Sequence, residues 1–508
     1  MCPFSIYAEG KTPQTSISYD LWIKGGTIVD GLGKKPFKGD ILIRNDTIEF
    51  LGTPPRNSAI KASHVIDAKD KMVTPGFIDI HTHFDGPSSE NPEDIALANF
   101  LSMGVTTINI GQCGDSPAGT DDLRAWLEQI ERQKPGVNLL TFVGHNTIRE
   151  KTGVGLRKTP STSELEAMKN LLRKGLDAGA FGLSFGLEYE PGKFSEKEEW
   201  LALAKVVGRK GSVMSHLRNE DDDRLESSMK EFLTLTQVTN AHISHLKSVY
   251  GKGEKRGQEI LAILNNARKQ GFRVTADTYP YTASATTINI LFPDWVNSAN
   301  VDEMKKSRRE ELLTYIRTKV TKRNGPAATL FTEIKKFPNF VGKTLDDLAK
   351  DLKRPFEEVI VDEIGFSGAS AVYFVMDEEL QDVIARDPNV AIGSDGSPRS
   401  KHPRAFGTFA KFIRHFVVEK NYLTLEEAVR KVTGLPSTIL GLKDRGLLKE
   451  RYKADILIFA PKNAKDRATY LSPQELATGF DYVILNGKIA LRDGKIESRY
   501  GTVIKSDL

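Results

Sequence analysis

Six side chains of the types that bind zinc are spread along the sequence, each where a predicted strand ends. They are His81, His83, Cys113, His216, His245 and Asp395. Side chains alternate between the two faces of a strand, so the His-x-His pair of His81 and His83 points to one side. Thiolate, imidazole and carboxylate groups together are typical zinc ligands. The pattern therefore predicts a metal centre.

Each of these residues, taken alone, has a structural explanation. A buried cysteine usually behaves as a small hydrophobic residue, and a single histidine is usually a core residue with its hydrogen bonds satisfied. His242 is three positions from His245, so the two should face opposite sides of a strand, and His245 is the better ligand. We assign the remaining histidines to the structural role: His64, His145, His242, His402 and His415.

The elements that position these residues alternate between apolar strands and helical patterns. The first strand is the run 77–80 before His81, and helices are predicted at 92–104 and at 163–179, the latter capped by Ser163. The other strands are predicted at 105–113, 139–145, 180–189, 212–220, 241–247, 272–281 and 390–395. Eight such units in series predict an α/β fold, a (β/α)₈ TIM-like barrel with its active site at the carboxyl ends of the strands.

Two features lie outside the barrel pattern. About a hundred residues separate strands seven and eight, which predicts an insertion at about 288–385, serving as a lid or as a surface addition without a role. Short strands at both chain ends predict one small β-sandwich built from both termini. The predicted division is 1–71 for the N-terminal tail and sandwich part, 72–445 for the barrel, and 446–508 for the C-terminal sandwich part.

Composition excludes several classes of protein. The 508 residues carry 71 basic and 67 acidic side chains, a net charge of +4, which gives no basic surface for nucleic acid. No apolar run approaches the roughly 20 residues that span a membrane, and residues 1–18 lack the apolar core of a signal peptide. The chain has only two cysteines, Cys2 and Cys113, so no disulfide framework is expected. We expect a soluble cytoplasmic protein. Its oligomeric state is not encoded in these patterns.

Ten ordered motifs, covering the chain from about residue 20 to 496, carry a family resemblance. They are PGFIDIHTH (75–83), GQCG (111–114), GHNT (144–147), GLSFGLEY (182–189), SHLRNE (215–220), HISHLK (242–247), YPYTA (279–283), GSDG (393–396), HPRAFG (402–407) and TGLP (433–436). With them the chain resembles the amidohydrolase superfamily, and within it the N-acyl-D-amino-acid deacylases, or D-aminoacylases.

The resemblance implies a zinc-dependent hydrolase of small N-acyl-D-amino acids. Cys113, His216 and His245 are implied to hold a tightly bound zinc ion, and His81, His83 and Asp395 to hold or border a second, weaker position. Asp395 is implied as the general base and acid. Zinc lowers the pKa of a bound water to about 7 and polarises an amide carbonyl. The products would be a carboxylate and a free D-amino acid, with the D preference resting on the resemblance alone.

The α-carboxylate of such a substrate requires positive charge and hydrogen-bond donors. By resemblance, Lys247, Tyr279 and Arg404 bind it, and arginine suits this role because its guanidinium meets a carboxylate with two hydrogen bonds. The family usually has serine where Ala285 stands, and the preceding Ser284 is the candidate for that contact. An acidic substrate side chain would need further cations, and two basic residues after Asp395 are the candidates: Arg399 and Lys401.

Three alternatives remain at this stage. The first is a cyclic amidase of the hydantoinase or dihydroorotase type, which uses a carboxylated lysine from strand four, whereas strand four here contains no lysine. Near the end of this strand, Glu188 is either a bridging ligand or an ordinary polar residue. A non-catalytic scaffold with the same fold is a different class of protein. Finally, Arg218 and Glu220 either orient the metal ligands or form a plain salt bridge.

Overall fold

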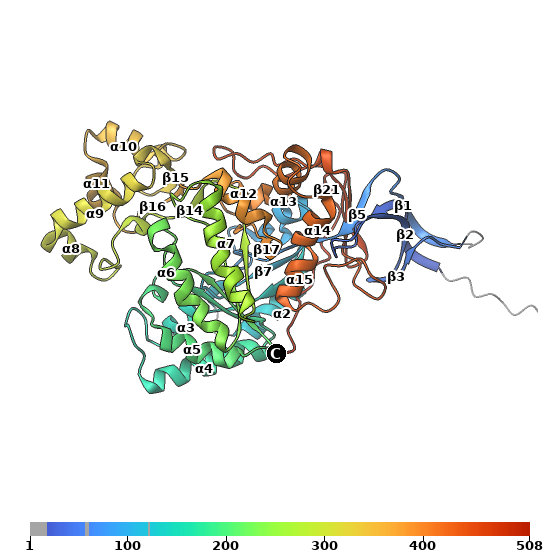
Figure 1. Cartoon of the computed structure of the whole chain (residues 1–508), viewed down its shortest axis with the longest axis horizontal. Helices are drawn as coiled ribbons and strands as arrows, with labels where there is room; N and C mark the ends of the chain where they lie inside the picture. Colours follow the sequence, from blue (N-terminus) through green and yellow to red (C-terminus); the bar gives the residue numbers. More distant parts are fainter. Residues whose placement is uncertain (1–17, 56–59, 120–121) are drawn as a thin grey trace, which may run out of the picture.

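The computed structural model describes residues 18–55, 60–119 and 122–508. The predicted tail therefore lies outside the described residues, apart from Ser18. The molecule is elongated, with the insertion at one end and a sheet of N-terminal strands at the other (Figure 1). Between them lie the parallel strands that carry the predicted ligands.

Every predicted barrel strand is present, most of them shorter than the apolar runs suggested. The third is divided at Phe142 into two pieces, β8 and β9. The strands are β6 (Phe77–Asp79), β7 (Val105–Ile110), β8 (Asn138–Thr141), β9 (Val143–Gly144), β10 (Gly182–Gly186), β11 (Ser212–His216), β12 (Asn240–Ile243), β13 (Val274–Thr278) and β17 (Val390–Ile392). They form two parallel sheets, β6-β7-β8 and β17-β13-β12-β11-β10-β9.

Hydrogen bonds join the two sheets on both sides. On one side, the amide of Phe181, directly before β10, donates to the carbonyl of Thr141 in β8, 2.9 Å away. On the other side, the amide of Asp395 donates to the carbonyl of His81 and the amide of His83 to that of Gly396, both at 2.8 Å. The strands therefore follow one another in the order of a (β/α)₈ barrel, and the last junction lies among the predicted ligands.

Helices follow the strands, with two local differences from prediction. The predicted helix at 92–104 is a 3₁₀ turn (Pro92–Ala96) and α1 (Ala98–Ser102), separated by Leu97 in a left-handed conformation with φ 49°. Helix α4 (Thr162–Asp177) is capped by Ser161, not by the predicted Ser163, because Ser161 and Glu164 form a reciprocal capping box. The other barrel helices are α2 (Leu123–Gln133), α3 (His145–Lys151), α5 (Lys197–Val207), α6 (Asp222–Leu233), α7 (Gly253–Lys269), α12 (Glu378–Arg386), α13 (Arg404–Phe412), α14 (Leu425–Val432) and α15 (Gly434–Leu440).

The insertion after strand seven has its own antiparallel sheet, β14-β16-β15. It also has a separate hydrophobic core, made of buried residues from Ile288 to Val375 together with Val249, which precedes strand seven. Buried residues of α12, such as Leu380, instead join the core of the barrel. The elements of the insertion are β14 (Ser284–Thr287), α8 (Val301–Ser307), α9 (Arg309–Lys322), β15 (Thr329–Ile334), α10 (Leu345–Leu352), α11 (Phe356–Glu358) and β16 (Ala369–Tyr373).

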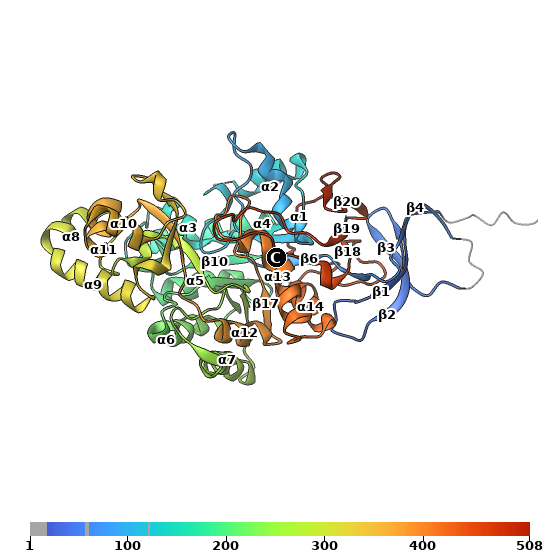
Figure 2. The same ribbon diagram turned by 90° about the horizontal axis from the view of Figure 1, so that it is seen from above.

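Strands from both chain ends form one nine-stranded sheet. Strand β5 pairs with β1 on one side and with β18 on the other, and Lys71 binds Asp481 at 3.0 Å across the same junction. Its strands are β1 (Ser18–Ile28), β2 (Phe37–Arg44), β3 (Thr47–Gly52), β4 (Lys61–Asp67), β5 (Met72–Pro75), β18 (Ile456–Phe459), β19 (Phe480–Leu485), β20 (Lys488–Arg492) and β21 (Lys495–Ile496). Figure 2 shows β18–β20 lying between the N-terminal strands and the barrel. The two-layer packing of a sandwich stays a prediction.

Within the described part of the chain, none of the helices combines the length and the apolar character needed to cross a lipid bilayer.

Candidate metal centre

The six predicted ligands, far apart in sequence, lie together at the carboxyl ends of the parallel strands. His81 and His83 follow β6, Cys113 follows β7, His216 ends β11, His245 follows β12 and Asp395 follows β17. Three overlapping groups of their donor atoms lie within 4.8 Å of one another: His81–His83–Cys113, Cys113–His216–His245 and His81–His245–Asp395. One cluster at the expected end of the fold therefore contains all six.

The group of Cys113, His216 and His245 matches the donors expected for a tightly held zinc ion. The Sγ of Cys113 is 3.5 Å from Nε2 of His245, which is 2.9 Å from Nδ1 of His216. Zinc binds sulfur and nitrogen at about 2.0 to 2.3 Å, so donors around one ion lie about 3 to 4 Å apart. All three residues are buried. The residues present therefore fit zinc in number, type and spacing.

His81, His83 and Asp395 form a second group, which also contacts Cys113. Its Sγ is 3.4 Å from Nε2 of His81, and Oδ1 of Asp395 is 3.0 Å from Nε2 of His83 and 3.7 Å from Nε2 of His81. The side chain of His83 is 38% exposed, whereas that of His81 is fully buried. This group is therefore the more open of the two, and its role as a second, weaker metal position stays a prediction.

Three of the six ligands have an unusual backbone conformation. Cys113, His245 and Asp395 are left-handed, with φ of 52°, 36° and 49°. Residues other than glycine rarely adopt this conformation, and such residues concentrate at functional sites. A residue in this conformation interrupts the alternation of side chains between the two faces of a strand. The turn that follows each strand therefore sets the direction of these three side chains.

A buried aspartate that we had not predicted supports the ligands from inside the barrel. Asp277 of β13 accepts hydrogen bonds from the amide of His245 at 3.0 Å and from Nε2 of His242 at 2.8 Å, and its Oδ2 is 3.5 Å from Nδ1 of His81. Burial opposes ionisation of Asp277, but His81 and His242 outweigh it and hold its pKa below the usual range. His242 therefore has a structural role, as predicted, in holding this carboxylate. The signal in the sequence that could have identified Asp277 was a carboxylate within an otherwise buried strand.

The two acidic residues left open by the sequence both contact histidine ligands. Oε2 of Glu188 is 2.9 Å from Nε2 of His216, and Oε1 of Glu220 is 3.1 Å from Nδ1 of His245. Carboxylates in such positions orient a metal-binding imidazole through its second nitrogen. Arg218 instead binds Glu231 at 3.0 Å, so it forms the salt bridge of the alternative interpretation.

The predicted substrate-binding residues surround the same centre. Arg404 binds Oδ2 of Asp395 through Nη2 at 2.9 Å and lies over the ring of Tyr279, 4.8 Å from its centroid. Lys247 lies 5.9 Å from that centroid, and its Nζ is 2.6 Å from Oε1 of Glu220. Burial opposes ionisation of Asp395, but the nearby Arg404 holds its pKa well below the usual range. Asp395 is thus kept ionised.

A small cavity of about 20 Å³ lies directly over the ligands. Among its lining residues are Lys247, Arg404 and Ser284, joined by Arg323 from the insertion. Arg399, in contrast, binds Asp94 at the surface, and exposed Lys401 binds Gln474, so neither residue lines this cavity.

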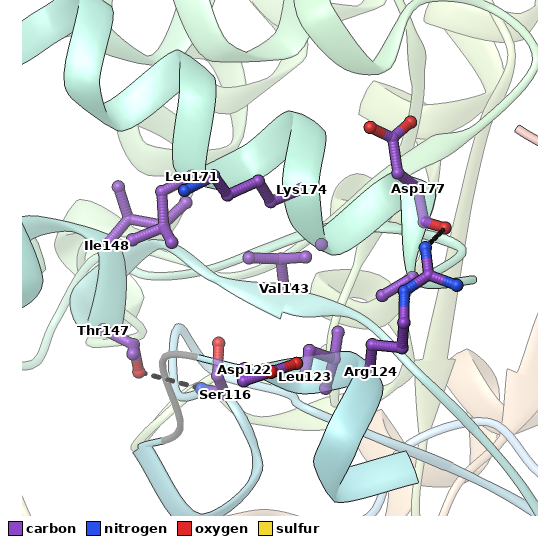
Figure 3. Close-up of a pocket in the computed structure, with 12 residues that line it drawn as sticks. Ser116, Asp122, Leu123, Arg124, Val143, Thr147, Ile148, Leu171, Lys174 and Asp177 are labelled. Carbon is purple, nitrogen blue, oxygen red and sulfur yellow. Dashed lines mark hydrogen bonds between the residues drawn. The ribbon is translucent and has the colours of Figure 1, made fainter. Parts of the chain in front are cut away.

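A larger cavity of about 420 Å³ lies elsewhere, among α2, α3 and α4 (Figure 3). Its wall includes Ser116, whose amide donates to Oγ1 of Thr147, and Lys174. None of the six predicted ligands lines it. The chemistry therefore belongs to the smaller cavity.

Comparison with known proteins agrees with this geometry. The model of the Amidohydrolase family matches residues 64–290 and 352–491. The chain is 31% identical to the N-acyl-D-glutamate deacylase of Alcaligenes xylosoxydans xylosoxydans, covering 96% of this chain and 97% of the relative, and 28% identical to the D-aminoacylase of the same organism, covering 92% and 94%. A solved N-acyl-D-glutamate deacylase from Bordetella bronchiseptica, complexed with zinc and a phosphonate inhibitor, is 30% identical with a TM-score of 0.82, covering 96% of this chain and 100% of that one.

Hydantoinases are more distant. The D-hydantoinase of a Thermus species is 14% identical with a TM-score of 0.58, covering 96% of this chain and 99% of that one. At this level of sequence identity, the similarity shows a shared fold alone.

Proposed function

The chain belongs to the amidohydrolase family, and we propose that it hydrolyses the amide bond of N-acyl-D-amino acids, releasing a carboxylate and a free D-amino acid. The observation that carries this proposal is one cavity lined by His216, His245, Asp395 and Arg404. The thiol of Cys113 lies 3.5 Å from Nε2 of His245, one of these lining residues. The deacylase relatives, which match along nearly their whole length, supply the substrate class.

Zinc held by Cys113, His216 and His245 would polarise the scissile carbonyl and lower the pKa of an attacking water to about 7. Asp395 is the group that accepts the proton of that water and delivers it to the leaving nitrogen. Its contacts with Arg404 and His83, at 2.9 and 3.0 Å, support this assignment because they favour the ionised carboxylate.

The α-carboxylate of the substrate is assigned to Arg404, Lys247, Tyr279 and Ser284. Two of these, Arg404 and Lys247, lie over the ring of Tyr279, which supports a common subsite. Lys247 binds Glu220 and Arg404 binds Asp395, so each cation must share its hydrogen-bond donors between that carboxylate and the substrate. Residues His81, His83 and Asp395 remain the proposed second, weaker metal position.

The wider architecture is part of the same proposal. We infer that the two parallel sheets close into a (β/α)₈ barrel over residues 72–445, supported by the hydrogen bonds at both junctions. The sandwich part of 1–71, which follows the predicted tail, and the segment 446–508 are inferred to form the small terminal β domain, supported by the β5–β18 pairing. A cytoplasmic location stays a prediction from the sequence.

A screen of N-acetyl-D- and N-acetyl-L-amino acids, with and without added zinc, tests the function. We expect hydrolysis of D substrates by the zinc-loaded protein and much slower hydrolysis of L substrates. Hydantoin and dihydroorotate, included as cyclic amides, should not be turned over, since strand four provides no lysine to bridge two metals. Zinc well below one ion per chain, with no hydrolysis after zinc addition, would favour the non-catalytic scaffold.

A further inference from the structure

One wall of the cavity over the ligands contains a buried ion pair between the barrel and the insertion. Asp221, which directly precedes α6, accepts two hydrogen bonds at Oδ1 from Arg323, one from Nε at 3.0 Å and one from Nη2 at 2.6 Å. Arg323 follows α9 and is 4% exposed, and Asp221 is 8% exposed. Arg323 lines the cavity. The insertion thus contributes a cation to the substrate site, but one whose charge is already paired.

The second oxygen of Asp221 also faces a cation of the insertion. Its Oδ2 is 3.9 Å from Nζ of Lys319, one turn before Arg323 on α9. Burial and the neighbouring Arg323 lower the pKa of Lys319 to about 8. Both oxygens of Asp221 are therefore turned toward cations of the insertion, Oδ1 toward Arg323 and Oδ2 toward Lys319.

This wall is distinct from the proposed α-carboxylate subsite. Lys247 and Arg404 share the ring of Tyr279, whereas Arg323 contacts Asp221. The cavity lining also includes apolar side chains: Val249, Ala285 and Ile290. Val249 forms a parallel bridge with Asp221, so the apolar surface and the ion pair are adjacent.

We propose that Asp221, by occupying Arg323, selects substrates whose amino-acid side chain carries no charge. The inference rests on the proposed function and names the substrate class of that site. A substrate carboxylate approaching Arg323 meets the like charge of Asp221, and displacing Asp221 would leave a buried carboxylate without its partner, which is strongly unfavourable. An uncharged side chain packs against Val249, Ala285 and Ile290 and leaves the pair intact.

Two substrates of nearly equal size separate charge from shape: N-acetyl-D-glutamine and N-acetyl-D-glutamate. We expect the wild type to show a kcat/KM for the glutamine derivative at least about tenfold above that for the glutamate derivative. The Asp221→Asn variant removes the competing charge and leaves Arg323 available. The ratio should then shift toward glutamate by about tenfold to a hundredfold, the range expected for one hydrogen bond to a charged group.

Two further variants control the interpretation. In Asp221→Asn/Arg323→Met the cation that lines the cavity is also gone, so the ratio should return toward that of the wild type. Asp223→Asn removes a carboxylate two positions away whose partner is Lys322, at 3.0 Å on the surface, and should leave the ratio unchanged. If Asp221→Asn does not fold, judged by circular dichroism, Asp221→Ser carries the same expectation.

One set of outcomes overturns the inference about Asp221, and a different outcome overturns the proposed function on which it rests. A wild type that cleaves the glutamate derivative as fast as the glutamine derivative, or an unchanged ratio in a folded Asp221 variant, overturns the inference alone. Failure of the zinc-loaded wild type to cleave any N-acetyl-D-amino acid overturns the proposed function and the inference with it.

Discussion

At the scale of single residues, Asp395 has the position from which a proton can be accepted and returned. It is 10% exposed at its side chain and held between His83 and Arg404. Asp395→Asn should lower kcat by about 10² to 10⁴-fold, the usual contribution of general acid–base catalysis. The tight zinc site does not include Asp395, so zinc content measured by mass spectrometry should stay near one per chain. Turnover close to that of the wild type would remove Asp395 from this role.

Glu220 is expected to govern zinc affinity without touching the metal. Its Oε1 lies 3.1 Å from Nδ1 of His245 and 2.6 Å from Nζ of Lys247. Glu220→Gln should weaken zinc binding by about 10 to 100-fold, as for other carboxylates that orient a histidine ligand. Competition with a chromogenic chelator measures this. The matched change Glu231→Gln, in a residue that pairs with Arg218, should leave affinity unchanged, and equal affinities for the two variants would argue against the orienting role.

Residue types and spacing predicted the six candidate ligands because strand ends are visible in the sequence as apolar runs followed by polar residues. The supporting contacts were not visible. The left-handed φ of Cys113, His245 and Asp395 aims these side chains in a way that strand alternation does not describe. Asp277 and Glu220 act on residues about 30 positions away through side-chain directions set by tertiary packing.

At the scale of elements, Phe77 on β6 joins the barrel to the terminal sheet. Its ring lies 5.8 Å from that of Phe409 on α13, 6.2 Å from Phe459 on β18 and 5.9 Å from Phe480 on β19, centroid to centroid. Phe77→Ala should cost about 3 to 5 kcal/mol, the range for a buried phenylalanine. Thermal unfolding of the zinc-loaded variant measures the loss. Phe37→Ala, at a ring that is 42% exposed, is the matched control and should change the melting temperature little.

The existence and order of the elements followed from hydrophobic periodicity, whereas their ends did not. The helix predicted at 92–104 has the right apolar stripe, yet Leu97 adopts a left-handed conformation that periodicity does not encode. For α4, the predicted cap is Ser163, whereas the reciprocal bonds of Ser161 with Glu164 place the cap two residues earlier.

At the scale of the whole molecule, the metal centre should contribute to global stability. The predicted ligands follow or end five strands of the two parallel sheets, so a bound ion would connect the two sheets. Removing zinc with a chelator should lower the melting temperature, since a ligand present at 100 times its Kd stabilises by about 2.7 kcal/mol. Added zinc should restore it.

The Cys113→Ser variant serves as the reference for this measurement. It should melt at the same temperature with and without chelator, because it has already lost the thiolate that the tight site requires. If the wild type also melts at one temperature under both conditions, the ion does not support the fold.

The ion pair of Lys71 with Asp481, which accompanies the β5–β18 pairing, joins residues 410 positions apart. A ribosome adding about 5 to 20 residues per second needs roughly 20 to 80 s to make that stretch. During this time the nascent β5 has an edge with no partner to cover it. Because β18 is synthesised long after β5, the exposed edge of β5 is a binding site for a chaperone during this interval.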